Sequence, residues 1–306
     1  MTASPAGRDE SGTLSPITAG TLSLVLLLTL VWGFSWPVMK IGVTELAPLT
    51  FRAITLPFSA LSMLAFAKLS GDSILVPRRL WGKVAALALF NISAWNGLVL
   101  FGVQQLPSGR SAILAYTMPI WTVLFSLVLL HEPLSKRKLI GMALGMTGMA
   151  VLLGDDVRHF ERTPLAALFI LGAALTWAFG IVLVRKWRLP LPPNTLSGWM
   201  ILLGWLPIIA LAPLLEHGPI HSFSTITWFA ILYNIFLGGA LAQWAWLALV
   251  RSVPVVVTSM SSLPVPIVGV FAGMLVLGER PGLGEWTALA LVVAAMVAVF
   301  WPQKST

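Results

Sequence analysis

The chain has 306 residues, of which 58% are hydrophobic and only 10% charged, and its mean hydropathy is +0.90. A soluble globular domain carries about 25% charged residues, so the composition indicates a polytopic membrane protein. The net charge is +8, but the basic residues form no run interleaved with aromatic side chains, which argues against nucleic acid as a partner. Cysteine is absent, which excludes a disulfide framework and a thiolate metal site or nucleophile.

The elements expected along the chain are membrane-spanning helices. A polar tail, residues 1–19, comes first, and we expect it to be retained because no small-residue cleavage pattern follows the first apolar run. About 20 apolar residues are needed for a helix to cross the hydrocarbon core. Ten such spans are predicted, near residues 20–40, 47–68, 82–103, 109–131, 137–154, 164–185, 195–215, 225–250, 254–277 and 284–302. The predicted fold class is therefore all-α, with ten transmembrane helices.

The spans form an internal repeat. A Pro-Ile dipeptide followed by a glutamate thirteen positions after the proline occurs twice, 147 residues apart, and the copies end at Glu132 and Glu279. The repeats are expected at 20–157 and 164–303. Because each contains five spans, an odd number, the second enters the membrane from the opposite side, which predicts two inverted repeats around a central cavity. Both glutamates then lie at membrane edges, where we expect loop or helix-end caps.

The distribution of charge predicts the orientation of the bundle. Thirteen of the 19 basic residues fall on the side of the N-terminus, and seven of the eleven acidic residues fall on the other. The positive-inside rule therefore predicts that both termini are cytoplasmic and that the protein lies in the bacterial inner membrane. No phosphate-binding loop or dinucleotide fingerprint occurs, and the four histidines lie at span ends or in loops, so neither ATP, a metal nor another cofactor is expected.

The motifs resemble those of a known family. The tripeptide that begins at Trp32, Arg52 early in the second span and the duplicated Pro-Ile passage resemble the EamA repeat of drug/metabolite transporter superfamily exporters, over residues 20–302. The chain is most similar to the YddG-type bacterial exporters of aromatic amino acids. The resemblance implies export of small metabolites through the lipid bilayer. It departs from the pattern in one respect, since Trp199 stands where a second copy of Arg52 would be.

Residues that break the repeat are the candidates for recognition, because an amino acid or drug is not symmetric. The predicted substrate-binding residues are Trp95, Asn96, Tyr116, Trp177, Gln243 and Trp246. Asn91 and Asn234 occupy equivalent places and are expected to make interhelical hydrogen bonds. On a regular α-helix Gln243 would face about 180° away from Asn234, so only one of the two is expected to line the cavity.

The fourth and ninth spans carry matching stripes of small and polar residues. The first stripe is Ser111, Ala115, Met118, Thr122 and Ser126, and the second is Thr258, Ser262, Val265, Gly269 and Gly273. Two interpretations are open, tight helix packing or the lining of a conduit. The predicted cavity-lining or gating residues are Ser111, Met118, Pro119, Thr122, Thr258, Ser262, Pro264 and Pro266. The prolines predict broken helices, since each removes a helical hydrogen bond.

Three further alternatives stay open at this stage. No carboxylate lies in the middle of a span, which favours facilitated diffusion or exchange over a proton relay. Arg52 and Lys40 either snorkel or pack against Glu45, or they attract a carboxylate. The glycines of the fifth span (Gly141, Gly145 and Gly148) serve packing within the monomer or a dimer face. We expect no enzyme activity, although a nucleotide-sugar or drug transporter and a lipid-modifying enzyme are the rival functions.

Overall fold

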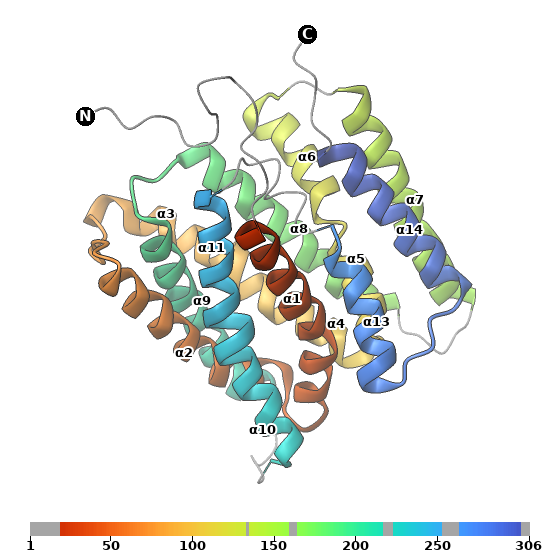
Figure 1. Ribbon diagram of the computed structural model, residues 1–306, viewed down its shortest axis with the longest axis horizontal. Coiled ribbons are helices and arrows are strands. Elements are labelled where there is room, and N and C mark those ends of the chain that lie inside the picture. The colour runs from red at the N-terminus through yellow and green to blue at the C-terminus, as the bar shows by residue number, and fades with distance from the viewer. Residues whose placement is uncertain (1–18, 133–134, 159–163, 217–222, 253–262, 301–306) are drawn as a thin grey trace.

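A computed structural model describes residues 19–132, 135–158, 164–216, 223–252 and 263–300. Within these ranges the secondary structure is helical, without strands, and the helices form one bundle in which α1 begins and α14 ends on the same side (Figure 1). We call this the N-terminal side, since α1 begins there. The predicted tail lies outside the described residues apart from Ala19, and so do Thr258 and Ser262.

The described helices follow the predicted spans, and of the ninth, 254–277, only the part from residue 263 lies within the described residues. The first repeat contains α1 (Ala19–Glu45), α2 (Pro48–Leu69), η1 (Arg78–Leu80), α3 (Trp81–Ala88), η2 (Leu89–Ala94), α4 (Trp95–Gln105), α5 (Ser108–Ala115), α6 (Met118–Leu130) and α7 (Lys136–Arg158). The second contains α8 (Pro164–Trp187), α9 (Pro193–Leu215), α10 (Thr225–Leu232), η3 (Tyr233–Leu241), α11 (Ala242–Ser252), α13 (Val265–Leu277) and α14 (Leu283–Phe300). Eight stretches are long and apolar enough to cross a membrane, and α13 and α14 are shorter apolar helices.

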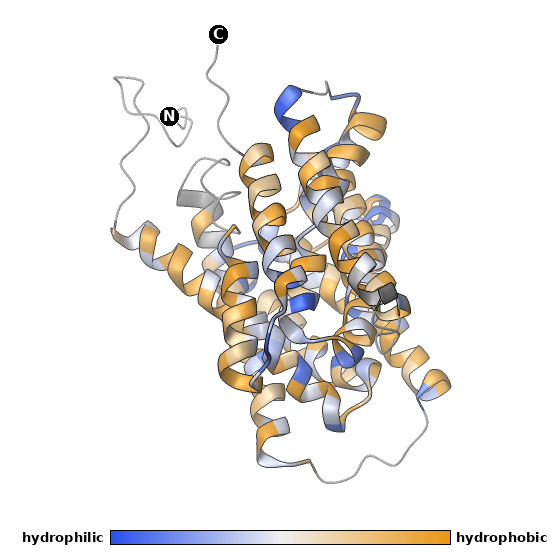
Figure 2. Ribbon diagram, turned by 90° about the vertical axis from the view of Figure 1, so that its right-hand side faces the viewer, coloured by the Kyte–Doolittle hydropathy of each residue, from blue (hydrophilic) through white to orange (hydrophobic). Residues whose placement is uncertain are grey.

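The outer surface of the bundle is apolar. Large hydrophobic side chains such as Leu26, Phe58, Leu168 and Phe236 are exposed, and apolar residues dominate the outward faces of the helices (Figure 2). A soluble protein would bury such residues, whereas lipid favours them on the surface. The fold prediction of an all-α membrane protein is confirmed.

The second spans of the two repeats run antiparallel. At one end of the pair, the Thr195 hydroxyl at the start of α9 donates to the Ser73 carbonyl just after α2, at 2.8 Å. At the other end, the Glu216 carboxylate just after α9 accepts from the Leu49 amide in the first turn of α2, at 2.6 Å. Equivalent helices of opposite direction are what an inverted repeat requires, so this prediction is confirmed as well.

A turn lies at the same place in the fourth span of each repeat. A turn at Tyr116 and Thr117 separates α5 from α6, and a turn at Leu263 and Pro264 precedes α13. The broken helix predicted from the prolines is thus confirmed in the first repeat, where Pro119 lies in the first turn of α6. The turn divides the stripe from Ser111 to Ser126, so that Ser111 and Ala115 lie on α5 and the remaining members on α6.

The helices that follow these two turns, α6 and α13, also end alike. Residue His131 after α6 and Gly278 after α13 both adopt the left-handed conformation, with φ of 55° and 66°. The next amide in each case returns to a carbonyl six residues earlier, from Glu132 to Ser126 and from Glu279 to Gly273. A left-handed residue followed by an amide that returns to the helix therefore caps the C-terminus in each case. The duplication therefore extends to the caps.

The third span of each repeat contains a π-helical segment that the sequence did not predict. In η2 and η3 the segments include the equivalent asparagines Asn91 and Asn234. A π-helix closes hydrogen bonds from i to i+5, so it turns through a smaller angle per residue than an α-helix. The predicted half-turn between Asn234 and Gln243 assumed a regular α-helix and is therefore wrong.

The glycines of the fifth span pack against α14 within the same chain (Figure 1). A Cβ atom at Gly141 would lie 2.9 Å from the Ala295 carbonyl, and one at Gly148 would lie 3.2 Å from Leu291 Cβ. These glycines bring α7 and α14 into close contact, as small residues do between membrane helices. The monomer-packing interpretation holds for them.

Replacing Gly141 by alanine should lower the free energy of unfolding by about 1–3 kcal/mol, because the added methyl group overpacks the contact with α14. Gly154 on the same helix is the matched control, since no atom lies within 4 Å of a Cβ placed there. Gly154→Ala should stabilise the protein by up to about 1 kcal/mol through helix propensity. Thermal unfolding of both variants in detergent measures the difference, and equal midpoints would contradict the packing argument.

Candidate functional site

Two tryptophan pairs join the repeats at mid-depth. Trp32 of α1 lies against Trp246 of α11, with ring centroids 5.5 Å apart, and Trp95 of α4 lies against Trp177 of α8, at 5.1 Å. Trp32 and Trp177 are equivalent residues near the middle of the first span of each repeat. Each pair thus connects the first span of one repeat with the third span of the other. Of the predicted aromatic residues, the structure brings Trp95 and Trp177 together in one pair and places Trp246 in the other, with Trp32.

Hydrogen bonds reinforce the same two contacts. The Asn91 side-chain amide donates to the Trp177 carbonyl at 3.1 Å, and the Tyr233 hydroxyl donates to the Val31 carbonyl at 2.7 Å. The interhelical role predicted for Asn91 is confirmed. Asn234 also bonds to another helix, although as an acceptor from Arg52. The first span of each repeat is therefore held to the third span of the other by polar as well as aromatic contacts.

The other predicted binding residues lie near these pairs or within the core. Tyr116 is buried at the break in the fourth span, in the same hydrophobic cluster that Trp95, Trp246 and Met118 pack against. Asn96 is buried, and its amide donates to the Ile92 carbonyl of its own helix at 2.8 Å. Gln243 is half-buried on α11, one turn from Trp246.

The predicted gating residues are mostly satisfied within their own helices. The Ser111 hydroxyl is fully buried and donates to the Pro107 carbonyl, and the Thr122 hydroxyl donates to the Met118 carbonyl. Pro119 and Pro264 are half-buried, and Pro266 is buried.

The second stripe contributes to helix packing. A Cβ at Gly269 would lie 3.0 Å from Ala112 Cβ, and one at Gly273 would lie 2.7 Å from Ser108 Oγ. The small residues of α13 therefore allow close approach of α5, which supports the packing interpretation at these two positions.

Carboxylates from one repeat hold helix N-termini of the other at the side opposite to the start of α1. The Glu279 carboxylate accepts from the amides of Ser108 and Gly109, at 2.5 and 3.0 Å, at the start of α5. The Glu216 carboxylate likewise holds the start of α2, and Glu45 accepts from the Ser224 amide before α10, at 2.9 Å. We call this the capped side.

These caps are electrostatically favourable, because the N-terminus of a helix carries unsatisfied amides and the positive end of its dipole. The capping role predicted for Glu279 is confirmed. Glu132, its equivalent, makes an ion pair with Lys138 at 3.0 Å instead. Each of the three caps on the capped side connects the two repeats.

A buried ion pair adjoins the caps, and the sequence did not predict it. Arg110 in the first turn of α5 lies 3.0 Å from Glu285 of α14 and also donates to the Leu152 carbonyl. Its exposed fraction is 1%. A cavity of about 140 Å³ lies beside it, lined by residues that include Val270, Glu279 and Arg280. Hydropathy had placed Arg110 at the outer edge of a span, and no local pattern marks its distant partner.

Arg52 does not contact Glu45, which corrects one of the two interpretations offered for it. Its guanidinium group is buried and donates to Asn234 Oδ1 at 3.1 Å and to Met39 Sδ at 2.8 Å. The Lys40 ammonium donates to the Gln104 carbonyl at 2.7 Å. Glu45 is engaged elsewhere, as a cap on the segment that leads into α10.

Comparison with known proteins identifies the family. Residues 20–154 and 164–301 each match the EamA-like transporter family, which accounts for both halves of the chain. The chain belongs to the EamA-like transporter family. This EamA-like chain is 29% identical over 277 residues to the uncharacterized inner membrane transporter YedA of Escherichia coli K12, covering 89% of the chain and 88% of that protein.

Other relatives of this EamA-like protein are also named as transporters. It is 23% identical to the uncharacterized transporter YoaV of Bacillus subtilis, covering 84% of the chain and 88% of YoaV. It is 26% identical to a probable amino-acid metabolite efflux pump of Escherichia coli K12, covering 90% and 94%. A crystal structure that is 19% identical has the same fold, with a TM-score of 0.66 over 92% of this chain and 96% of the other. The protein is thus a multi-pass membrane protein of a transporter family.

Proposed function

We propose that this protein is a secondary transporter that exports small metabolites, among them amino acids including aromatic ones, by alternating access. The observation that carries the proposal is the pair of tryptophan contacts between the repeats at mid-depth. Indole rings stack on aromatic substrates and also pair with each other in their absence. Their position supports a site near the middle of the membrane at the repeat interface, where inverted-repeat transporters place their substrates. The 26% identity to a protein named as a probable amino-acid metabolite efflux pump agrees with this cargo.

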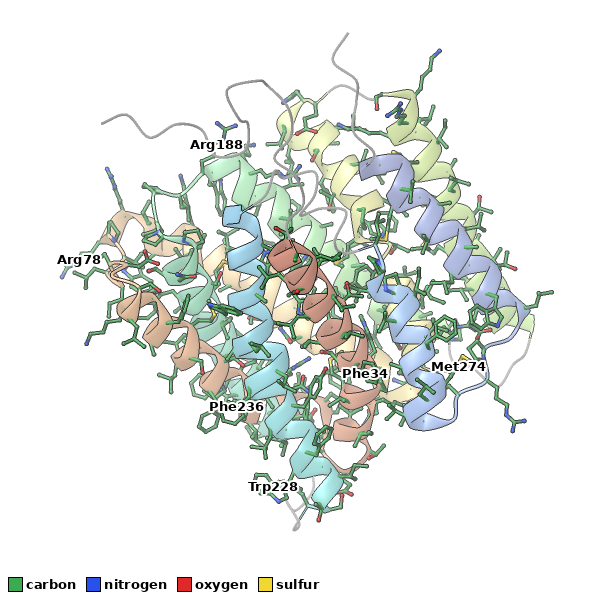
Figure 3. All side chains as sticks on the ribbon, in the orientation of Figure 1. Phe34, Arg78, Arg188, Trp228, Phe236 and Met274 are labelled. Atoms are coloured by element: carbon green, nitrogen blue, oxygen red, sulfur yellow. The ribbon has the colours of Figure 1, made fainter. Side chains whose placement is uncertain are left out.

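The capped side supports the alternating-access part of the proposal. The contacts of Glu45, Glu216 and Glu279 each cross from one repeat to the other, so opening this side requires the repeats to move apart. Basic side chains such as Arg78 and Arg188 lie toward the other side, while Trp228 lies at the capped end (Figure 3). By the positive-inside rule the N-terminal side is cytoplasmic, and the capped side then faces out of the cell across the inner membrane.

The proposed transport is facilitated diffusion or exchange. Among the described residues, Glu45, Glu216, Glu279 and Glu285 lie at helix ends, and each is engaged with an amide or an arginine. A proton relay would need a titratable group deeper in a span. We therefore propose a function that needs the bilayer and a small-molecule substrate, with no ATP, cofactor, nucleic acid or enzymatic step.

Counterflow of labelled phenylalanine in proteoliposomes tests the proposal. Unlabelled tryptophan and phenylalanine should compete more strongly than alanine, and a nucleotide sugar should not compete. Trp177→Ala should raise the KM for phenylalanine about fivefold, the loss expected for one aromatic contact, and leave that for alanine less affected. Trp286→Ala, at a half-exposed residue that contacts Phe271, is the control.

The rival functions give different results in the same assay. Competition by the nucleotide sugar alone would favour the other branch of the superfamily. Acceleration by an imposed pH gradient, beyond its effect on substrate charge, would overturn the facilitative mechanism.

A further inference from the structure

Arg52 presents a buried positive charge whose hydrogen-bond partners are both neutral. It lies in the second turn of α2 with an exposed fraction of 9%. Its hydrogen bonds go to the amide oxygen of Asn234 and to the sulfur of Met39, and within the described chain no carboxylate contacts it. Burial of a charge without an opposite charge costs several kcal/mol. The other buried arginine of the described chain, Arg110, has Glu285.

One edge of the guanidinium is held by a hydrogen bond, and the other edge has no strong acceptor. Its Nη1 donates to Asn234 Oδ1, and the Asn234 Nδ2 donates to the Ala230 carbonyl at 3.0 Å, which fixes the amide with its oxygen toward Arg52. Its Nη2 has only the Met39 thioether, a weak acceptor, and its Nε has no partner. The Nε and Nη2 hydrogens form a parallel fork, which matches the two oxygens of a carboxylate.

A strip of α1 leads from that edge toward the middle of the bundle, where it ends at the pair of Trp32 and Trp246. Along α1, Met39 and Trp32 lie seven residues apart on one face, about 10 Å along the helix axis. Between them Ser35 faces the π-helical segment, where a Cβ at Gly238 would lie 3.5 Å from its hydroxyl oxygen. Trp246 covers the inner end against Trp32. A strip with a cation at one end and indoles at the other has the polarity of an amino acid with an apolar side chain.

The matching strip of the other repeat lacks the cation. Trp199 stands at the place of Arg52, and its ring nitrogen donates to the Ile74 carbonyl at 2.8 Å while its ring contacts Trp81. A carboxylate can therefore be recognised on only one side of the pseudo-twofold axis, which suits an asymmetric substrate.

We propose that Arg52 binds the carboxylate of the transported metabolite through its Nε and Nη2 edge, in place of the Met39 sulfur, with Asn234 holding the guanidinium in position. This inference rests on the proposed function and adds to it a substrate class, carboxylates with an apolar side chain. The carboxylate supplies the opposite charge that the protein itself does not place beside Arg52.

The test compares phenylalanine with its carboxamide, phenylalaninamide, in proteoliposomes containing the full chain. The wild-type protein should prefer phenylalanine, and Arg52→Gln should reduce that preference about 10- to 100-fold, the range for a lost charged hydrogen bond. Lys40→Gln is the matched control, because it also removes a positive charge from the capped side. Unlike Arg52, the Lys40 ammonium donates to the Gln104 carbonyl. Its preference should equal that of the wild type.

A second variant keeps the inference testable even where Arg52→Gln does not fold. Asn234→Asp places a resident carboxylate on the guanidinium, so it should raise the thermal unfolding midpoint and raise the KM for phenylalanine, with little change for the amide. An unchanged KM in this variant, or a folded Arg52→Gln protein that keeps the wild-type preference, would refute the role of Arg52 alone. Wild-type protein that transports neither probe would refute the proposed function itself.

Discussion

A disulfide between cysteines introduced at Gly109 and Val270 should stop transport when it forms, and a reducing agent should restore it. Gly109 lies in the first turn of α5, and a Cβ placed there would be 3.1 Å from Val270 Cα on α13. Such proximity allows a disulfide to form with little backbone movement. Because the natural chain contains no cysteine, the introduced pair has no competitor.

The expected effect is large because the bond joins the two repeats at the capped side. If this side must open during each cycle, a covalent link next to the Glu279 cap prevents the cycle from finishing. Counterflow is measured after oxidation and again after reduction, with mass spectrometry to quantify the bond. Each single-cysteine variant, treated identically, is the control. Complete crosslinking with undiminished transport would show that α5 and α13 do not separate.

Removing the carboxylate of Glu285 should cost about 3–5 kcal/mol of unfolding free energy, the range for breaking a buried ion pair by removing one partner, here the partner of Arg110. Glu285→Leu is the test, measured by thermal unfolding in detergent. The double variant Arg110→Met, Glu285→Leu should recover most of the loss, since an apolar pair of similar volume needs no charge compensation.

The exposed pair Lys138 and Glu132 provides the control for this experiment. Its side chains are 24% and 37% exposed, so Lys138→Met should change stability by less than about 1 kcal/mol. A double variant at Arg110 and Glu285 that is less stable than either single variant would mean that packing, rather than charge, governs the site.

The sequence predicted the features that depend on local physics. Span length follows from hydrophobicity, so the described helices could be located from the sequence. The break before α6 follows from Pro119, which cannot donate a helical hydrogen bond. The cap at Glu279 followed from its place at a membrane edge in an inverted repeat, which left it near helix ends.

The remaining features depend on contacts that no local pattern encodes. Arg110 meets Glu285 across 175 positions, and Arg52 meets Asn234 across 182. Hydropathy placed both arginines near the edges of spans and could not show that they are buried. The π-helical segments have no marker residue, which is why the relative orientation of Asn234 and Gln243 was wrong. Trp95 and Trp177 were chosen singly, and only the fold shows that they form a pair.

The packing of α2 along α9 and of α7 along α14 bears on the ancestry of such a chain. Each of these helices buries a face against its own counterpart, so one five-span unit alone would leave both faces to lipid. Two separate copies could cover them only if one copy were inserted upside down, which demands evenly divided basic residues. Fusion into a single polypeptide allows a strong charge bias between the two sides, with 13 of 19 basic residues predicted on one side here. The order of the two copies in the chain then fixes the orientation of each.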